Sequence, residues 1–311
     1  MSSVDWQAQK VNGMADTKQI TRTDSGLLVL APAKINLSLL IAGKRADGFH
    51  EIETIMAKID LFDELLLEPS DTEGIHLVCR GKYSAPDGPE NLVHQACLKL
   101  CQAGGITPAV KLTLTKNIPT GSGLGGGSSD AAAALIGLNR LSGLALPQEK
   151  LSEIASELGS DVPFFLGGPL SFCNGRGEKI KKIEKNFNFT AILALPAVTV
   201  STKEVYENYR HEKGLYKSLN SQIKQLIEKK SIDLVSQMCA NMLQSSCLNL
   251  HGQLGHIGEI MESVCGGGVC LSGSGSAMFC MVADEKNLDR FQSELFELTG
   301  CVSVAVHNNR W

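Results

Sequence analysis

One glycine-rich segment constrains the fold of this chain more than any other feature. It runs from Asn117 to Asp130 and contains the sequence Gly-Ser-Gly-Leu-Gly-Gly-Gly-Ser-Ser. The alternating residues 110–114 before it predict a strand, and the alanine-rich stretch to Leu141 after it predicts a helix that Ser128, Ser129 and Asp130 begin. Glycines let a backbone wrap closely around an anion, and a helix N-terminus offers unpaired N–H groups. The segment therefore predicts a phosphate-binding loop.

Three other interpretations of the loop fit less well. Gly121, Gly123 and Gly126 have the G-x-G-x-x-G spacing of an NAD-dependent dehydrogenase, but that fingerprint needs an acidic residue about 20 residues further on, after a strand. Here that region is a predicted helix followed by the Pro147 loop. A Walker A loop needs Lys after its last glycine, where this chain has Ser128. A flexible linker would not separate a predicted strand from a predicted helix start.

Composition limits the remaining possibilities. The 311 residues suit two modest domains, and the net charge of −4, without a long basic run, argues against nucleic-acid binding. Ten cysteines without a Cys-x-x-Cys pair predict free thiols and a cytoplasmic location. No apolar stretch approaches the ~20 residues that cross a membrane. Residues 1–25 are polar and aperiodic, which predicts a disordered extension.

Predicted strands and helices mix along the rest of the chain, so the fold class is α+β or α/β. Strands are expected over 27–30, ending at Pro32, and over 35–41, with a domain boundary near Pro196. Other strands are expected near 61–67, 75–79, 191–195, 269–272, 278–283 and 302–306. Other helices are expected after Asn91 and near 149–158, 203–210, 217–228, 231–243, 253–264 and 286–298.

Two charged residues stand in apolar surroundings. Lys34 lies in a predicted strand, where a cation needs a partner or a ligand, although edge strands also carry lysines. Asn36 shares its strand face. Asp161 precedes Val162-Pro163, which is typical of a helix N-cap, and a carboxylate is also suited to act as a general base. The residues alone leave both roles open.

Four segments in order resemble the GHMP kinase superfamily, and together they span residues 28 to 283. Besides the loop, they are Ala31–Leu37 continuing into Arg45–His50, Gly159–Pro163, and Leu271–Ser276. The Gly-Gly-Gly-Ser-Ser form resembles the branch that acts on a diphosphocytidyl derivative of methylerythritol. The resemblance implies an α+β fold with a left-handed βαβ N-terminal domain over 26–195, which binds ATP, and a ferredoxin-like C-terminal domain on the substrate side over 196–311.

The resemblance also implies an activity and its residues. The reaction would be phosphoryl transfer from ATP with Mg²⁺ to the 2-hydroxyl of the methylerythritol unit, with Asp161 and Lys34 as catalytic residues. The residues implied for ATP are Pro119, Gly121, Ser122, Gly123, Leu124, Gly125, Gly126, Gly127, Ser128, Ser129 and Asn91. Those implied for the substrate are Asn36, Phe49, His50, Tyr206, Gly273 and Gly275. The residues that contact Mg²⁺ are not identified.

Phe49 departs from the pattern, because the superfamily branch usually carries Tyr there; the ring is kept and the hydroxyl is lost. Two rival functions remain: another GHMP kinase acting on mevalonate, homoserine or a sugar, and an inactive ligand sensor on the same fold. The expected partner is a small cytidine diphosphate derivative, with no nucleic acid and no membrane, and the expected state is a monomer or weak homodimer.

Overall fold

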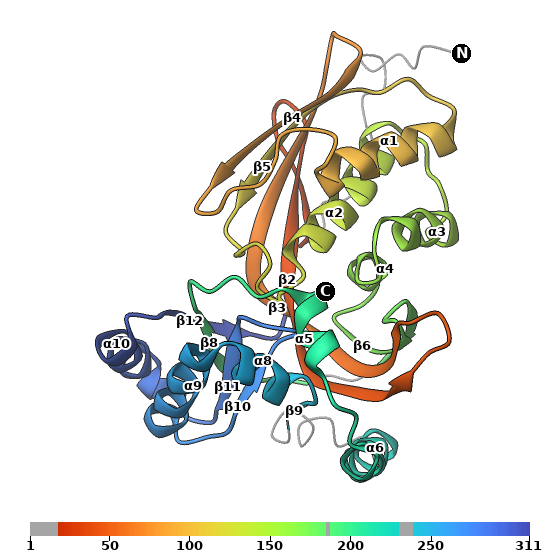
Figure 1. Ribbon diagram of the computed structural model, residues 1–311. Helices are drawn as coiled ribbons and strands as arrows, with labels where there is room; N and C mark the ends of the chain where they lie inside the picture. Colours follow the sequence, from red (N-terminus) through yellow and green to blue (C-terminus); the bar gives the residue numbers. More distant parts are fainter. Residues whose placement is uncertain (1–17, 185–186, 230–238) are drawn as a thin grey trace.

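The protein folds around two β-sheets (Figure 1). The computed structural model describes residues 18–184, 187–229 and 239–311. Within these ranges the larger sheet contains β1 (Ile20–Arg22), β2 (Leu27–Lys44), β3 (His50–Pro69), β4 (Gly74–Gly81), β5 (Ala109–Lys116), β6 (Leu170–Gly175), β7 (Lys179–Lys182) and β9 (Ala240–Asn241). The smaller sheet contains β8 (Thr190–Leu195), β10 (Val269–Leu271), β11 (Met278–Val282) and β12 (Val302–His307).

A long antiparallel hairpin of β2 and β3 connects the two parts of the molecule (Figure 1). The sequence predicted that the first strand ends at Pro32, and this is wrong, because β2 continues to Lys44. The pairing register shifts between Pro32 and Lys34. Such an irregularity accommodates a proline, which has no N–H to donate to the neighbouring strand. The middle of β2 is buried, so both of its faces are covered.

Helices cover the larger sheet on the right-hand side of Figure 1. They are α1 (Leu92–Gly104), α2 (Gly126–Leu141), α3 (Gln148–Leu158) and α4 (Val162–Leu166). The buried alanines 131–134 and Gly137 let α2 pack closely on the hairpin, since a Cβ at Gly137 would meet Leu67 and Val29. β4 and β5 are parallel neighbours joined by α1, so the sheet contains the expected βαβ unit.

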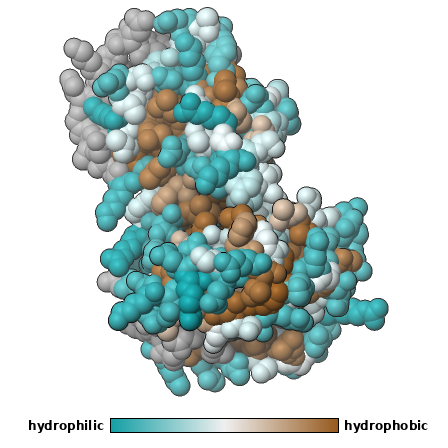
Figure 2. Space-filling view, turned by 90° about the vertical axis from the view of Figure 1, so that its left-hand side faces the viewer, coloured by the Kyte–Doolittle hydropathy of each residue, from teal (hydrophilic) through white to brown (hydrophobic). Residues whose placement is uncertain are grey.

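The smaller sheet has the strand order β10-β11-β8-β12, and each neighbouring pair is antiparallel. In chain order this is a β-α-β-β-α-β arrangement, which is typical of a ferredoxin-like fold. The helices of this half are α5 (Thr202–Asn208), α6 (Lys213–Glu228), α8 (Gln244–Leu250), α9 (Gly252–Cys265), the short 3-10 helix η1 (Glu285–Asn287) and α10 (Leu288–Thr299). The two-domain α+β architecture predicted from the sequence is confirmed. On the face shown in Figure 2, the protein forms two lobes that meet at a narrower waist.

The sheets divide the chain differently from the boundary expected near Pro196. β8 pairs with β11 and β12, so residues 190–195 belong to the C-terminal sheet rather than to the N-terminal domain. In the other direction, β9 adds to the larger sheet by pairing with β2. A helix was predicted over 231–243; residues 231–238 lie outside the described ranges, and 240–241 form a strand instead. The predicted domain limits of 26–195 and 196–311 therefore stay a proposal, in which β8 has to move to the C-terminal domain and β9 to the N-terminal sheet.

The predicted N-terminal extension also needs correction. Residues 20–22 form β1 and pair antiparallel with β2, and the Ile20 side chain is buried. The prediction of disorder to residue 25 is wrong for this part, because one isoleucine among polar residues is enough to fill a site on the edge of the sheet. Residues 1–17 lie outside the described part of the chain.

Candidate active site

A cavity of about 910 Å³ lies between the β2–β3 hairpin, the glycine loop and α5. Nine of the predicted site residues line it: Lys34, Asn36, Phe49, His50, Gly123, Gly125, Asp161, Tyr206 and Gly273. The other residues predicted for ATP do not line this cavity, and Gly275 lies against Cys247 instead. Segments that are far apart in the sequence thus meet around one cavity.

Lys34 is at the centre of these contacts. Its buried Nζ donates to Asn36 Oδ1 at 2.6 Å and to the carbonyl oxygen of Gly123 at 2.7 Å. The Asp161 carboxylate lies 3.9 Å from the same nitrogen. Burial lowers the pKa of Lys34, and Asp161 opposes that shift. Lys34 therefore connects the phosphate loop to the predicted base, and the alternative of a surface lysine on an edge strand is wrong.

Asp161 stands immediately before α4. Its side chain makes no capping hydrogen bond, so the N-cap role that the sequence left open is not adopted. The carboxylate is 36% exposed, which leaves it accessible to a ligand in the cavity. Burial raises the pKa of Tyr206 to about 12, and the Asp161 charge adds to this shift. The position of Asp161 suits a group that accepts a proton from a bound hydroxyl.

The glycine loop needs its glycines for close approach to other protein segments as well as for its turns. Gly121, Gly123 and Gly125 have positive φ, which favours glycine. A Cβ at Gly123 would clash with the Ser272 carbonyl oxygen. The following helix begins at Gly126, not at Ser128 as predicted, and no side chain caps its N-terminus. The first N–H groups of a helix have no partner within the helix. The buried Ser129 hydroxyl has no hydrogen-bond partner among the described residues.

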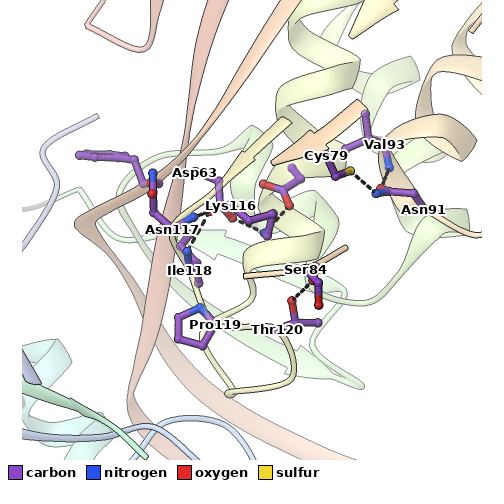
Figure 3. A network of polar contacts seen from close by, with 12 residues as sticks. Asp63, Cys79, Ser84, Asn91, Val93, Lys116, Asn117, Ile118, Pro119 and Thr120 are labelled. Atoms are coloured by element: carbon purple, nitrogen blue, oxygen red, sulfur yellow. Dashed lines mark hydrogen bonds and ion pairs between the residues drawn. The ribbon is translucent and has the colours of Figure 1, made fainter. Parts of the chain in front are cut away.

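The ends of the loop are held by an ion-pair network (Figure 3). Lys116, the last residue of β5, pairs with Asp63 and, at 2.6 Å, with Asp130 of α2. Asp63 also accepts hydrogen bonds from the backbone N–H groups of Asn117 and Ile118. Burial, together with neighbouring Asp63, raises the pKa of Asp130 to about 8, although Lys116 opposes this. The network fixes the entrance and exit of the loop, so Asp130 is a supporting residue rather than a cap.

Asn91 connects the start of α1 to the loop between β4 and α1 (Figure 3). Its Oδ1 caps α1 by accepting from Val93 N at 2.9 Å, and its Nδ2 donates to the Pro86 carbonyl at 2.7 Å. Thr120 of the glycine loop donates at 3.2 Å to the carbonyl oxygen of Ser84, which lies in the loop between β4 and α1. These two hydrogen bonds engage both ends of the Asn91 amide. A role of Asn91 in binding ATP stays a prediction.

The C-terminal glycine motif closes the site from the other domain. The Gly273 N–H donates to Asn36 Oδ1 at 2.9 Å, and Ser272 Oγ donates to the Gly123 carbonyl at 3.0 Å. Asn241 Nδ2 bonds the carbonyl oxygens of Leu271 and Gly273. Asn241 was not predicted as a site residue, since it lay inside a predicted helix and no local pattern distinguishes it.

Aromatic rings form the far end of the cavity. The His50 and Tyr206 ring centroids are 5.1 Å apart, and Tyr209 meets His50 edge-on at 5.9 Å. Burial lowers the pKa of His50, and Lys44 and His211 add to that shift, which favours the neutral imidazole. Flat rings beside a hydrogen-bonding imidazole can hold a heteroaromatic base. Arg176, which was not predicted as a site residue, lies over the Phe49 ring with its guanidinium carbon 5.1 Å from the centroid.

A second buried lysine lies beside the first. Lys58 of β3 stands directly opposite Lys34 of β2 and is 1% exposed. Its Nζ donates to the carbonyl oxygens of Phe165 at 3.2 Å and Gly167 at 2.8 Å, at the C-terminal end of α4. Burial lowers the pKa of Lys58 to about 8. Because α4 follows Asp161, Lys58 supports the element that positions the predicted base.

A glycine loop before a helix, closed by a ferredoxin-like domain and facing a lysine–aspartate pair, defines a small-molecule kinase of the GHMP class. The model of the GHMP kinases N terminal domain matches residues 91–168. A solved homoserine kinase from Cytophaga hutchinsonii superposes with a TM-score of 0.72 at 20% identity, over 96% of this chain and 98% of that one. That likeness shows the shared fold.

Closer relatives define the family. A 4-diphosphocytidyl-2-C-methyl-D-erythritol kinase from Bacillus pumilus is 40% identical over 269 residues, which are 86% of this chain and 92% of that protein. One from Geobacter sp. is 35% identical over 90% of this chain and 98% of its own length. A crystal structure of 4-(cytidine 5'-diphospho)-2C-methyl-D-erythritol kinase has a TM-score of 0.73 and 31% identity, covering 91% of this chain and 99% of its own. This chain belongs to the 4-diphosphocytidyl-2-C-methyl-D-erythritol kinase family.

Proposed function

We propose that this enzyme transfers a phosphoryl group from ATP to the 2-hydroxyl of 4-diphosphocytidyl-2-C-methyl-D-erythritol, a step of the methylerythritol phosphate route to isoprenoid precursors. One observation carries the mechanism: Lys34 Nζ bonds the Gly123 carbonyl and lies 3.9 Å from Asp161. A hydroxyl bound at Asp161 would therefore face a phosphate held by the loop. Most of the catalysis in such a transfer is positioning and neutralisation of charge.

Each residue has a distinct part in the proposed reaction. Asp161 accepts the proton of the attacking hydroxyl, which is a poor nucleophile while protonated. The Lys34 ammonium stabilises the negative charge that develops on the transferred group. Asn36 orients Lys34 and ties it to Gly273 of the other domain. The loop amides and the N-terminus of α2 hold the ATP phosphates, and the His50–Tyr206 rings receive the cytosine.

Kinases of this kind use ATP together with Mg²⁺, and the ion neutralises phosphate charge when it is bound. Oxygen ligands suit this ion, and two oxygens at the start of α2 fit it: Ser129 Oγ and Asp130 Oδ1 are buried without a hydrogen-bond partner in the described part of the chain. We therefore propose the start of α2 as the side from which the metal is held. Removal of Mg²⁺ by EDTA should abolish turnover, and added Mg²⁺ should restore it.

The proposed location is the cytoplasm, because no disulfide joins any of the ten cysteines in the described part of the chain. Seven of them are buried at sites that suit reduced thiols: Cys97, Cys101, Cys173, Cys247, Cys270, Cys280 and Cys301. Among the described residues, no helix is long and apolar enough to cross a membrane. The monomeric or weakly dimeric state stays a prediction.

An assay of ADP release with several acceptor alcohols tests the proposed function. The diphosphocytidyl substrate should be phosphorylated efficiently, whereas methylerythritol phosphate without its cytidine, mevalonate and homoserine should be poor acceptors. Equal turnover of the bare methylerythritol phosphate would contradict the substrate assignment. Binding of the diphosphocytidyl compound without any ADP release would instead identify an inactive ligand sensor.

A further inference from the structure

The predicted substrate residues lack a group that matches the charge of the substrate. A diphosphate diester carries two negative charges, yet Asn36, Phe49, His50, Tyr206 and the two glycines include no fixed cation. Buried Lys34 is already engaged by the loop and by Asp161. A cation elsewhere in the cavity wall is therefore needed.

Arg176 occupies such a position. It lies in the turn between β6 and β7, between Gly175 and Gly177, which both have positive φ. Its guanidinium carbon is 5.1 Å from the centroid of the Phe49 ring, and both residues line the cavity. A guanidinium stacked on a ring keeps its N–H groups in a plane and free at the edges. Phe49 thus fixes the direction of the Arg176 donors.

The Arg176 charge is left available for a ligand. Among the described residues, no carboxylate lies within ion-pair distance of its guanidinium. Asp47 pairs with Arg45, Glu178 accepts from the Arg176 backbone N–H at 2.6 Å, and the Arg176 charge acts on both carboxylates only from beyond ion-pair distance. The other cations of the wall suit this role less well. Lys203 lies 3.8 Å from Glu207, and exposed Lys44 lies over no aromatic ring in the described part of the chain.

The order of groups in the cavity matches the order of groups in the substrate. Gly177 lies against the base, since a Cβ there would stand 3.7 Å from Asp161 Oδ1. On its other side, Arg176 contacts Phe49, next to His50 and its partner Tyr206. The substrate has a polyol at one end, a nucleobase at the other and the diphosphate between them. A polyol at Asp161 and a base at His50 leave the diphosphate beside Arg176.

We propose that Arg176, supported by Phe49, binds the diphosphate group of the nucleoside diphosphate substrate. The proposal rests on the proposed function and adds a residue that determines specificity. A planar fork of donors pairs with two phosphate oxygens at once, which a lysine does not do. Phe49, which has lost the hydroxyl of the usual Tyr, keeps the ring that Arg176 needs.

Binding of truncated ligands tests the assignment directly. The affinities of CDP and of cytidine are measured by calorimetry with the ATP site saturated by a non-hydrolysable ATP analogue, for the wild type, Arg176→Gln and Arg176→Lys. Arg176→Gln should weaken CDP about 10- to 100-fold and leave cytidine unchanged, because only CDP has the phosphates. Arg176→Lys should restore part of the loss. The control Lys181→Gln removes one charge from the adjacent exposed strand and should change neither affinity.

The outcomes separate this proposal from the one on which it rests. The wild type could phosphorylate its substrate and yet bind CDP no better than Arg176→Gln does. That result would overturn the Arg176 assignment and leave the proposed function intact. Equal loss of CDP and cytidine in Arg176→Gln would overturn it too, since the residue would then act on the base or on the shape of the hairpin. A wild type that neither turns over the substrate nor binds CDP would overturn the proposed function.

Discussion

Buried Lys58 should make the stability of this protein rise with pH in the alkaline range. The side chain is 1% exposed, and within the described residues its only partners are the Phe165 and Gly167 carbonyls, so its charge is poorly compensated. Burial lowers its pKa from 10.5 to about 8. At about 1.36 kcal/mol for each pKa unit, keeping this lysine protonated in the folded protein costs about 3 kcal/mol near pH 7.

The sign of the effect follows from proton counts. Below pH 8 the lysine is protonated in both folded and unfolded states, so the full cost is present. Between about pH 8 and 10.5 the unfolded chain binds the proton and the folded protein does not, and stability rises with pH wherever the unfolded state binds more protons. At pH 10 the remaining cost is below about 1 kcal/mol, so about 2.5 kcal/mol is recovered.

Urea unfolding of the wild type and of Lys58→Met at pH 7 and pH 10 measures this difference. The free energy of unfolding of the wild type, relative to the variant, should increase by about 2.5 kcal/mol between the two pH values. Other titrating groups are common to both proteins and cancel. Methionine leaves two carbonyls without a donor, at about 1–3 kcal/mol each. That loss shifts the difference equally at both pH values.

The exposed strand residue Lys111 provides the matched control. Lys111→Met removes the same charge from a solvated position, so the stability difference from the wild type should not change by more than a few tenths of a kcal/mol between the two pH values. A pH-independent difference for Lys58→Met as well would refute the reasoning. It would mean that the Lys58 ammonium is solvated or paired in a way the structure does not show.

Three further predictions concern the base, the loop support and the N-terminal strand. Asp161→Asn should lower kcat about 10²- to 10⁴-fold without lowering the melting temperature, and near wild-type kcat would exclude the base role. Lys116→Met should destabilise the protein by about 3–5 kcal/mol in urea unfolding, because it leaves buried carboxylates unpaired; a loss below about 1 kcal/mol would contradict a buried network. A chain that begins at Ser25 loses buried Ile20 and should be less stable by about 1.5–3 kcal/mol, whereas unchanged stability would show that β1 contributes nothing.

Local signals in the sequence were enough to predict the glycine loop and the neighbouring helices. Alternation over 110–114 and the alanine-rich stretch after the loop correspond to β5 and α2. The ferredoxin-like half was predicted only through the resemblance, and the structure has the β-α-β-β-α-β arrangement of elements that is typical of such a fold. Predictions failed where a tertiary contact outweighs local preference. Pro32 does not end β2 because β3 pairs beyond it, and Ile20 forms a strand because β2 offers an open edge.

The residues that support the site were not predictable for a related reason. Lys116 and Asp63 are 53 residues apart, and Lys58 and Gly167 are 109 residues apart. A lysine in a strand gives no local sign of a partner at such a distance. Lys34 stood out as a cation in an apolar strand, but its catalytic role was predicted only because its segment resembles a known motif. Arg176 lies in an ordinary turn sequence, and only the fold brings it over Phe49.

The glycine motif predicted which ligand the loop binds, but it did not predict which parts of the protein the loop contacts. Its glycines were interpreted as space for phosphates, but the neighbours of Gly123 are protein atoms. The Ser272 hydroxyl donates to its carbonyl, and the Ser272 carbonyl occupies the place that a Cβ at Gly123 would need. The Lys34 N–H bonds the next carbonyl, that of Leu124, at 2.9 Å. Both domains therefore hold the loop in shape before any ligand arrives, so that its amides are already oriented when phosphates bind.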